Sequence, residues 1–300
     1  MGSMHTHRLS RAFVFGGTYG NLQATRAMLE QAYHLGFSPQ EIIFTGDSAA
    51  YCADPEATAR LIIDAGIPAI MGNCEEALAN DSADCGCGFE EGSACDLLSV
   101  QWFGYCRAHI SAYVRQWMAS LPRSLVVEIG KFRLLCTHAT PDSINRFVFA
   151  SDFATGKFSP LDGPYDGYVT GHSGIPFATG TNGKCWINTG AAGMPANDGT
   201  SRVWYGIIEQ QEDELVTRLM PLSYDYPAAI SSMEKNGLPT GYAQCLADGL
   251  WPSHDILPEV EKNAGGRALE ETTFRFCRKT GHAPAEPASP PDVSSSSAAE

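Results

Sequence analysis

Short apolar runs and amphipathic stretches alternate along the first 73 residues. The apolar runs are short, rich in β-branched residues, and end in Gly or polar residues, as buried strands do. The runs span residues 12–17, 41–47 and 67–73, and the stretches with helical periodicity between them span residues 21–36 and 54–66. Asp54 and Pro55 suit the N-cap and the first position of the second helix. This βαβαβ order predicts a parallel sheet covered by helices.

The rest of the chain is richer in strand-like segments. A helical stretch over residues 97–122 comes first, and the strand-like segments after it span residues 124–130, 131–139, 168–173, 184–190, 203–210 and 214–222. Helical patterning returns in residues 223–282, which we expect to form a helical extension. Residues 283–300 are mostly Pro, Ser and Ala with a few acidic residues. Such a segment buries too little apolar surface to order, so we expect a disordered tail.

Composition limits the class of protein. Three hundred residues that are 44% hydrophobic suffice for a large core. No run approaches the roughly 18 apolar residues of a membrane helix, and the first residues lack the apolar region of a secretory signal, so we expect a cytoplasmic protein without a membrane partner. The net charge of −14 disfavours nucleic acid as a bulk partner, because Lys and Arg normally neutralise its phosphates. Small phosphorylated molecules held by a metal remain candidate partners, and the oligomeric state stays open.

Four polar residues stand where predicted strands end and loops begin. The segments FTGDS, MGNCE, CTHAT and VTGHSG place Asp47, Asn73, His138 and His172 at these positions. Strand ends on a rigid scaffold commonly carry chemistry. Two oxygen and two nitrogen donors suit Fe, Mn or Zn. We therefore predict that these four residues bind one divalent metal ion.

Five of the ten cysteines lie close together in the sequence. They are Cys74, Cys85, Cys87, Cys95 and Cys106, and a CGC sequence lies in the middle of the group. A reducing cytosol argues against disulfides and leaves two interpretations, additional metal ligands or a solvent loop with free thiols. Exposed clustered thiols oxidise readily, which favours the metal.

Six motifs, in this order, resemble those of the calcineurin-like metallophosphoesterases, and in particular their compact bacterial branch. They are G-N-L-x-A after the first strand, G-D followed by a D-P-E helix start, G-N, a strand ending in His, G-H, and I-N-x-G. The similarity runs from about Arg11 to Tyr224. It implies a four-layer α/β/β/α sandwich with two metals above the sheet ends, where metal-activated water attacks a phosphate ester.

This resemblance also suggests a division of the chain. We expect a metallophosphoesterase-like domain with a Cys-rich insertion, followed by the extension. The limits are 1–10 for a flexible N-terminus, 11–222 for the domain, 74–106 for the insertion, 223–282 for the helical extension and 283–300 for the tail.

The sequence departs from the family pattern on one side of the metal centre. Gly17 and Tyr19 replace the Asp and His of the first motif D-x-H-G-N, and Gly174 replaces the second His of G-H-x-H. These changes remove ligands of the family's first metal. The residues of its second site match one by one, with Asp47 as the bridging carboxylate, together with Asn73, His138 and His172. The His that usually assists the leaving group is Cys74, and a thiol is a poor proton donor.

Four interpretations of the surviving site follow. In the first, a single ion activates water for hydrolysis of a phosphate mono- or diester. In the second, thiolates selective for Zn or Fe replace the missing ligands of the first metal, and they come from Cys74, Cys85, Cys87 and Cys95. Alternatively, the chain is a catalytically inactive binding protein, or a mononuclear iron enzyme with non-hydrolytic chemistry. For an active enzyme we predict Cys74, Asn21 and Tyr19 at the substrate. Asn21 equally suits the cap of the helix that begins at Leu22, and Tyr19 equally suits packing.

Overall fold

The computed structural model describes residues 6–160 and 162–278, whose strands form two mixed sheets. Six strands make up the first sheet, in the order β1 (Thr6–Leu9), β4 (Ser124–Ile129), β5 (Phe132–Thr137), β6 (Gly167–Thr170), β8 (Lys184–Asn188) and β7 (Phe177–Thr181). The second sheet has the order β11 (Thr272–Cys277), β10 (Glu214–Leu222), β9 (Val203–Gln211), β2 (Arg11–Phe15) and β3 (Ile42–Phe44). The expected tail at 283–300 lies outside the described residues.

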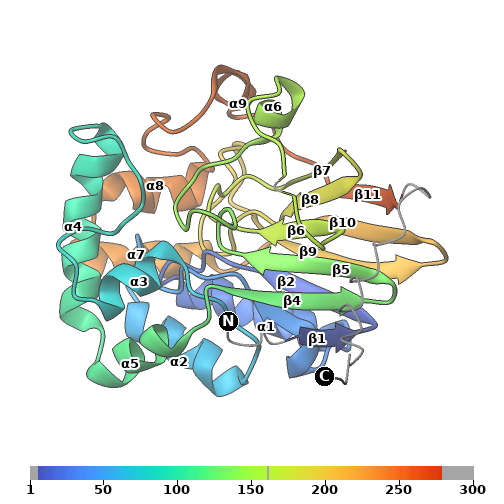
Figure 1. Cartoon of the computed structure of the whole chain (residues 1–300). Coiled ribbons are helices and arrows are strands. Elements are labelled where there is room, and N and C mark those ends of the chain that lie inside the picture. The colour runs from blue at the N-terminus through green and yellow to red at the C-terminus, as the bar shows by residue number, and fades with distance from the viewer. Residues whose placement is uncertain (1–5, 161, 279–300) are drawn as a thin grey trace, which may run out of the picture.

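Helices connect and flank these strands. They are α1 (Leu22–His34), the 3₁₀ turn η1 (Pro39–Glu41), α2 (Pro55–Ala65), α3 (Asn73–Ala79), α4 (Ala94–His109), α5 (Ala112–Ser120), α6 (Ala150–Ala154), α7 (Tyr226–Lys235), α8 (Thr240–Asp248) and α9 (Glu259–Ala264). In Figure 1, α4, α7 and α8 lie at one end of the sheets, on the left of the view. No helix among the described residues is both long and apolar enough to cross a membrane.

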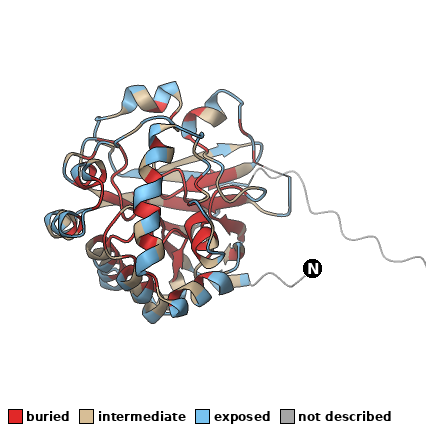
Figure 2. Ribbon diagram, turned by 90° about the vertical axis from the view of Figure 1, so that its left-hand side faces the viewer, coloured by how far each residue is buried: buried red, intermediate tan, exposed pale blue. Residues whose placement is uncertain are grey.

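The two sheets pack face to face through apolar side chains. Val14 and Ile43 of the second sheet share one core with Leu134 of the first. Met28 of α1 and Ile62 of α2 pack on the other face of the second sheet, and α6 lies on the other face of the first. Figure 2 shows this arrangement as buried strands surrounded by helices whose outer faces are exposed. The expected α/β fold with two sheets flanked by helices is confirmed.

Three sequence expectations about the elements are wrong. Residues 6–9 of the predicted flexible N-terminus form β1, which pairs in parallel with β4. The predicted helical extension ends in a strand, β11, because alternation in TTFRFC directs Phe276 into the core between the sheets. Residues 67–73 form no strand: Ala69 makes an isolated bridge with Phe44, and Asn73 begins α3.

The extension docks on the domain through polar contacts. Ser232 Oγ of α7 donates a hydrogen bond to Asp54 Oδ2, 3.1 Å away. Asp255, in the connection between α8 and α9, accepts from Ala94 N at the start of α4 (2.9 Å). The second contact holds the α8–α9 connection against the insertion, at the end of the sheets where the candidate ligands lie.

Candidate metal centre

Three of the four predicted ligands follow strands, and the fourth begins a helix. Asp47, His138 and His172 come directly after or just beyond β3, β5 and β6, and Asn73 is the first residue of α3. β5 and β6 run parallel, so their carboxyl ends meet at one edge of the sheet. Asp47 and His172 have positive φ angles of 62° and 58°. Such conformations are uncommon for residues other than Gly and often mark functional sites.

The side chains of these residues converge on one point. His138 Nε2 lies 3.2 Å from Asp47 Oδ2, 3.1 Å from Asn73 Oδ1 and 3.2 Å from His172 Nδ1. Asp47, His138 and His172 also form a set whose ligand atoms lie within 4.8 Å of one another. All four residues are buried, with at most 9% exposure. The structure therefore brings together the four residues predicted to bind a single ion.

The donor chemistry of this cluster fits a cation. His138 Nδ1 is 2.6 Å from the carbonyl oxygen of Thr45, which can only accept a hydrogen bond. In a neutral His138 the proton is therefore on Nδ1, and Nε2 presents its lone pair to two oxygen acceptors. Lone pairs that face one another in a buried site are unfavourable unless a proton or a metal ion lies between them. The four atoms thus suit a metal ion that takes oxygen and imidazole ligands.

The protonation states agree with this assignment. Burial and the neighbouring His138 lower the pKa of His172 to about 3, so this imidazole is neutral and able to bind a metal. Burial disfavours the charged form of His138, but the Asp47 carboxylate outweighs it and raises its pKa above the usual value. Burial likewise opposes ionisation of Asp47, yet His138 and His172 bring its pKa below 3.8. Without a metal, His138 therefore binds a proton more readily than a free imidazole does, beside an ionised Asp47.

Glu75 holds the backbone around Asp47 in place. Its carboxylate accepts hydrogen bonds from Asp47 N (2.7 Å), Ser48 N (2.5 Å), Ser48 Oγ (2.6 Å) and Gly72 N (2.9 Å). Asp47 Oδ1 in turn accepts from Cys74 N at the start of α3 (3.0 Å). A Cβ at Gly72 would lie 2.3 Å from Asp47 Oδ1, so only glycine allows this approach. Glu75 was not among the predicted site residues, although it directly follows Asn73 and Cys74 in the sequence.

The cysteines surround the amide group of Asn73. Asn73 Nδ2 donates to the carbonyl oxygen of Cys85 (3.1 Å) and lies 3.5 Å and 3.4 Å from the sulfurs of Cys74 and Cys87. These contacts point Oδ1 toward His138. Cys85 and Cys87 are joined by a disulfide, which corrects the expectation of free thiols in this segment. As disulfide sulfurs they are not thiolate ligands, and Cys74 and Cys95 are outside the set of candidate ligands found near Asp47.

Aromatic rings lie against Gly17 and Gly174, two positions at which the sequence departs from the family pattern. A Cβ at Gly17 would lie 2.7 Å from the ring and hydroxyl of Tyr19. A Cβ at Gly174 would lie 3.0 Å from the ring of Trp251, which comes from the extension. Trp251 is fixed there because its Nε1 donates to the carbonyl oxygen of Pro195 (2.7 Å). Nothing in the sequence pattern identified Trp251 as a neighbour of this site.

A pocket opens beside the candidate ligands. Asp47, Asn73 and His172 form its polar wall, and Tyr19 lies next to them. Its other walls come from the insertion, the extension and the loops after β3, β5, β6 and β8, and they are mostly apolar, with several aromatic rings. Cys87 and Cys95 of the insertion also reach it. Three of the four candidate ligands, Asp47, Asn73 and His172, are therefore accessible from a concave, mostly apolar surface.

The three predicted substrate-facing residues occupy different places. Tyr19 lines the pocket. Cys74 is 2% exposed and absent from the pocket wall, and burial followed by Asp47 and Glu75 raises the pKa of its thiol. Asn21 caps α1 by accepting from Ala24 N (3.1 Å), while its amide donates to Gly193 O and Tyr224 Oη. Of the two roles considered for Asn21, the structure gives it the helix cap.

Comparisons with known proteins agree with the fold. A model of the calcineurin-like phosphoesterase superfamily domain matches residues 6–213. A metallophosphoesterase from Sphaerobacter thermophilus superposes with a TM-score of 0.62 and 21% identity, covering 80% of this chain and 99% of that one. A hypothetical protein from Pyrococcus horikoshii gives a TM-score of 0.64 at 15% identity, covering 81% and 100%. At these identities the likeness shows the fold alone. A search of curated proteins gives no match.

Proposed function

The chain belongs to the calcineurin-like phosphoesterase superfamily, and on that premise we propose that it hydrolyses a phosphate mono- or diester at a single-metal site. Asp47, Asn73, His138 and His172 would hold one divalent ion, Fe, Zn or Mn. The convergence of three lone-pair atoms on His138 Nε2 supports this proposal most directly. When bound, such an ion supplies Lewis acidity and lowers the pKa of a coordinated water from about 15.7 toward 7.

The surrounding residues support the chemistry in different ways. Glu75 and Cys74 N fix the orientation of the Asp47 carboxylate, so that Oδ2 faces the other ligands. Burial, and then Asp47, raise the pKa of Tyr19, which keeps its hydroxyl protonated. Because Tyr19 lines the pocket, this hydroxyl is placed to donate a hydrogen bond to a phosphoryl or leaving-group oxygen. Cys74 lies behind the ligands and takes no part at the substrate in this proposal.

Elemental analysis of anaerobically purified protein, combined with a turnover assay, tests the proposal. We expect about one metal ion per chain and metal-dependent hydrolysis of an aryl phosphate ester. His172→Ala removes a ligand and should lose both the ion and turnover. Cys185→Ala is the matched control, because Cys185 is fully buried between the sheets and distant from the ligands in the sheet register. Equal metal content in the two variants would contradict the site, and bound metal without turnover would contradict hydrolysis.

A further inference from the structure

We propose that the pocket beside the metal centre selects a phosphodiester monoanion that carries an aromatic or other flat apolar group. This inference rests on the proposed function and narrows it to one substrate class. It follows from the charge of the metal centre, from the absence of cations in the pocket wall and from the side chains that form the wall.

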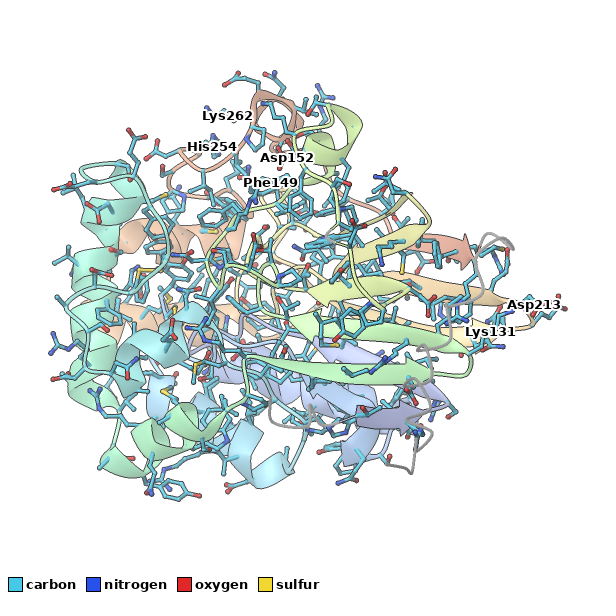
Figure 3. The ribbon with its side chains drawn as sticks, in the orientation of Figure 1. Lys131, Phe149, Asp152, Asp213, His254 and Lys262 are labelled. Carbon is cyan, nitrogen blue, oxygen red and sulfur yellow. A yellow bond between two sulfur atoms is a disulfide. The ribbon has the colours of Figure 1, made fainter. Side chains whose placement is uncertain are left out.

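The charge of the centre matches one negative charge. A divalent ion with Asp47 ionised and three neutral ligands retains one net positive charge, and Glu75 lies directly behind Asp47. Among the described residues that line the pocket, none is Lys or Arg. Figure 3 shows Lys262 at the outer edge of the extension and Lys131, beside Asp213, at the far end of the sheets. A second negative charge on the substrate would therefore be buried without a partner, which is costly.

Aromatic rings build the rest of the wall. Phe147 stacks on the His172 ring at a centroid distance of 4.3 Å, and Phe89 of the insertion lies 6.2 Å from Phe147. On another part of the wall, Tyr51 stacks on Tyr242 of α8 at 4.5 Å. Trp251 and Ile256 of the extension line it as well, together with smaller side chains from neighbouring segments. A flat apolar substituent would bury its surface against these rings and gain from offset or edge-to-face contact.

Part of the apolar wall comes from segments outside the strand-end motifs of the metal site. Phe89 belongs to the Cys-rich insertion, and Tyr242, Trp251 and Ile256 belong to the extension. Trp251 also occupies the space beside Gly174. The same ring therefore fills the vacated metal position and lines the pocket. The loss of the first metal and the gain of an apolar pocket are therefore two effects of one arrangement. A centre that holds two metals would tolerate a phosphate dianion, whereas this one favours the diester.

Binding measurements on the full chain loaded with one equivalent of Mn²⁺ test the inference without relying on activity. Calorimetry compares three ligands: diphenyl phosphate, a monoanion with two rings; dimethyl phosphate, a monoanion with none; and phenyl phosphate, a dianion with one ring. We expect diphenyl phosphate to bind at least tenfold more tightly than either of the others. Equal affinity for dimethyl phosphate would overturn the apolar pocket, and tighter binding of phenyl phosphate would overturn the charge match.

Two pocket variants sharpen the test. Ile256→Lys adds one positive charge to the wall and should bring phenyl phosphate to the affinity of diphenyl phosphate or beyond. Val260→Lys is the matched control, because Val260 lies nearby on α9, is 62% exposed and does not line the pocket, so the preference for diphenyl phosphate should persist. An identical effect of both lysines would refute a role for the pocket wall. Trp251→Ala should weaken diphenyl phosphate about tenfold and leave dimethyl phosphate unchanged.

Failure of this inference is distinguishable from failure of the proposed function. Tight binding of diphenyl phosphate without hydrolysis of a bis-aryl ester would retain the pocket preference and reject the enzyme. Hydrolysis with an equal or greater preference for phenyl phosphate would retain the enzyme and reject the preference for monoanions.

Discussion

The two halves of the centre differ in what fills them. On one side, Asp47, Asn73, His138 and His172 point lone-pair atoms at a common position. On the other, Gly17 and Gly174 leave room that the rings of Tyr19 and Trp251 occupy. Polar ligands are expensive to bury without a cation, whereas aromatic rings stabilise a buried site through packing. The contrast shows how apolar contacts can fill one side of a candidate metal centre while lone-pair atoms converge on the other side.

One substitution in each half gives the largest expected contrast. His138→Ala removes the central ligand, and we expect the metal content to fall from about one ion per chain to near zero. Tyr19→Phe changes only a hydroxyl in the vacated half, and we expect the ion to remain. Elemental analysis of the two purified variants measures both effects. If Tyr19→Phe also lost the metal, the separation of the halves would be wrong, because Tyr19 would then be a ligand.

Glu75→Gln probes the support of the surviving half. The carboxylate accepts four hydrogen bonds in a fully buried position, and an amide nitrogen in place of one oxygen would face donors. We expect a loss of about 3 kcal/mol in the free energy of unfolding, together with weaker metal binding. The neighbouring Glu76→Gln affects only a partly exposed ion pair with Arg123, so its expected loss is below about 1 kcal/mol. Urea unfolding distinguishes the two, and equal losses would contradict a special role for Glu75.

Much of this centre follows from the sequence because strand ends meet. Asp47, His138 and His172 each follow an apolar run, and the parallel pairing of β5 with β6 brings two of them to one edge. The position of these residues at the ends of predicted strands therefore predicts that they lie close together in the fold. Trp251 and the Cys85–Cys87 disulfide have no such signal, since their positions depend on how long loops pack. Asn21 illustrates a third case, in which helix capping and substrate contact predict the same residue type.

The pH dependence of metal affinity tests the charge pairing in the surviving half. The pKa of His138 is raised above its usual value, because the effect of Asp47 outweighs that of burial, so protons compete with the metal below this raised pKa. Affinity should rise about tenfold per pH unit below that pKa and level off above it. In the metal-free protein, the contribution of His138 to folding stability has the opposite pH dependence. Stability from His138 is full below about pH 6.5 and is lost as pH rises through its folded pKa, while stability from Asp47 is lost as pH falls below about 3.8. Calorimetric Zn²⁺ titrations and metal-free urea curves measure the two trends, and a flat affinity profile would argue against ligation by His138.

A double-mutant cycle tests the packing of the vacated half. Gly174→Ala places a Cβ 3.0 Å from Trp251 in a residue with φ of 73°, and we expect a loss of about 1–2 kcal/mol in the free energy of unfolding. In the Trp251→Ala background the steric part disappears, and the loss should shrink by about 0.5–1 kcal/mol. Gly237→Ala is the control, since its φ is 67° and a Cβ there meets nothing within 4 Å. If the stability losses of Gly174→Ala and Trp251→Ala were strictly additive, Trp251 would not be in steric contact with a Cβ at position 174.

The smallest expected effect concerns Cys85 and Cys87, which contact the amide group of Asn73. Because Cys85 and Cys87 form a disulfide and touch the metal ligands only through the amide of Asn73, they are not ligands in this structure. Replacing both with Ser should leave metal content at about one ion per chain and metal identity unchanged. Affinity should fall by less than about tenfold, because Asn73 keeps its bond to the carbonyl oxygen of Cys85. Elemental analysis of the double variant, with Cys136→Ser in the sheet core as the control, measures this. A change in metal identity or number would instead mean that thiolates in the insertion contribute to the centre when the disulfide is reduced.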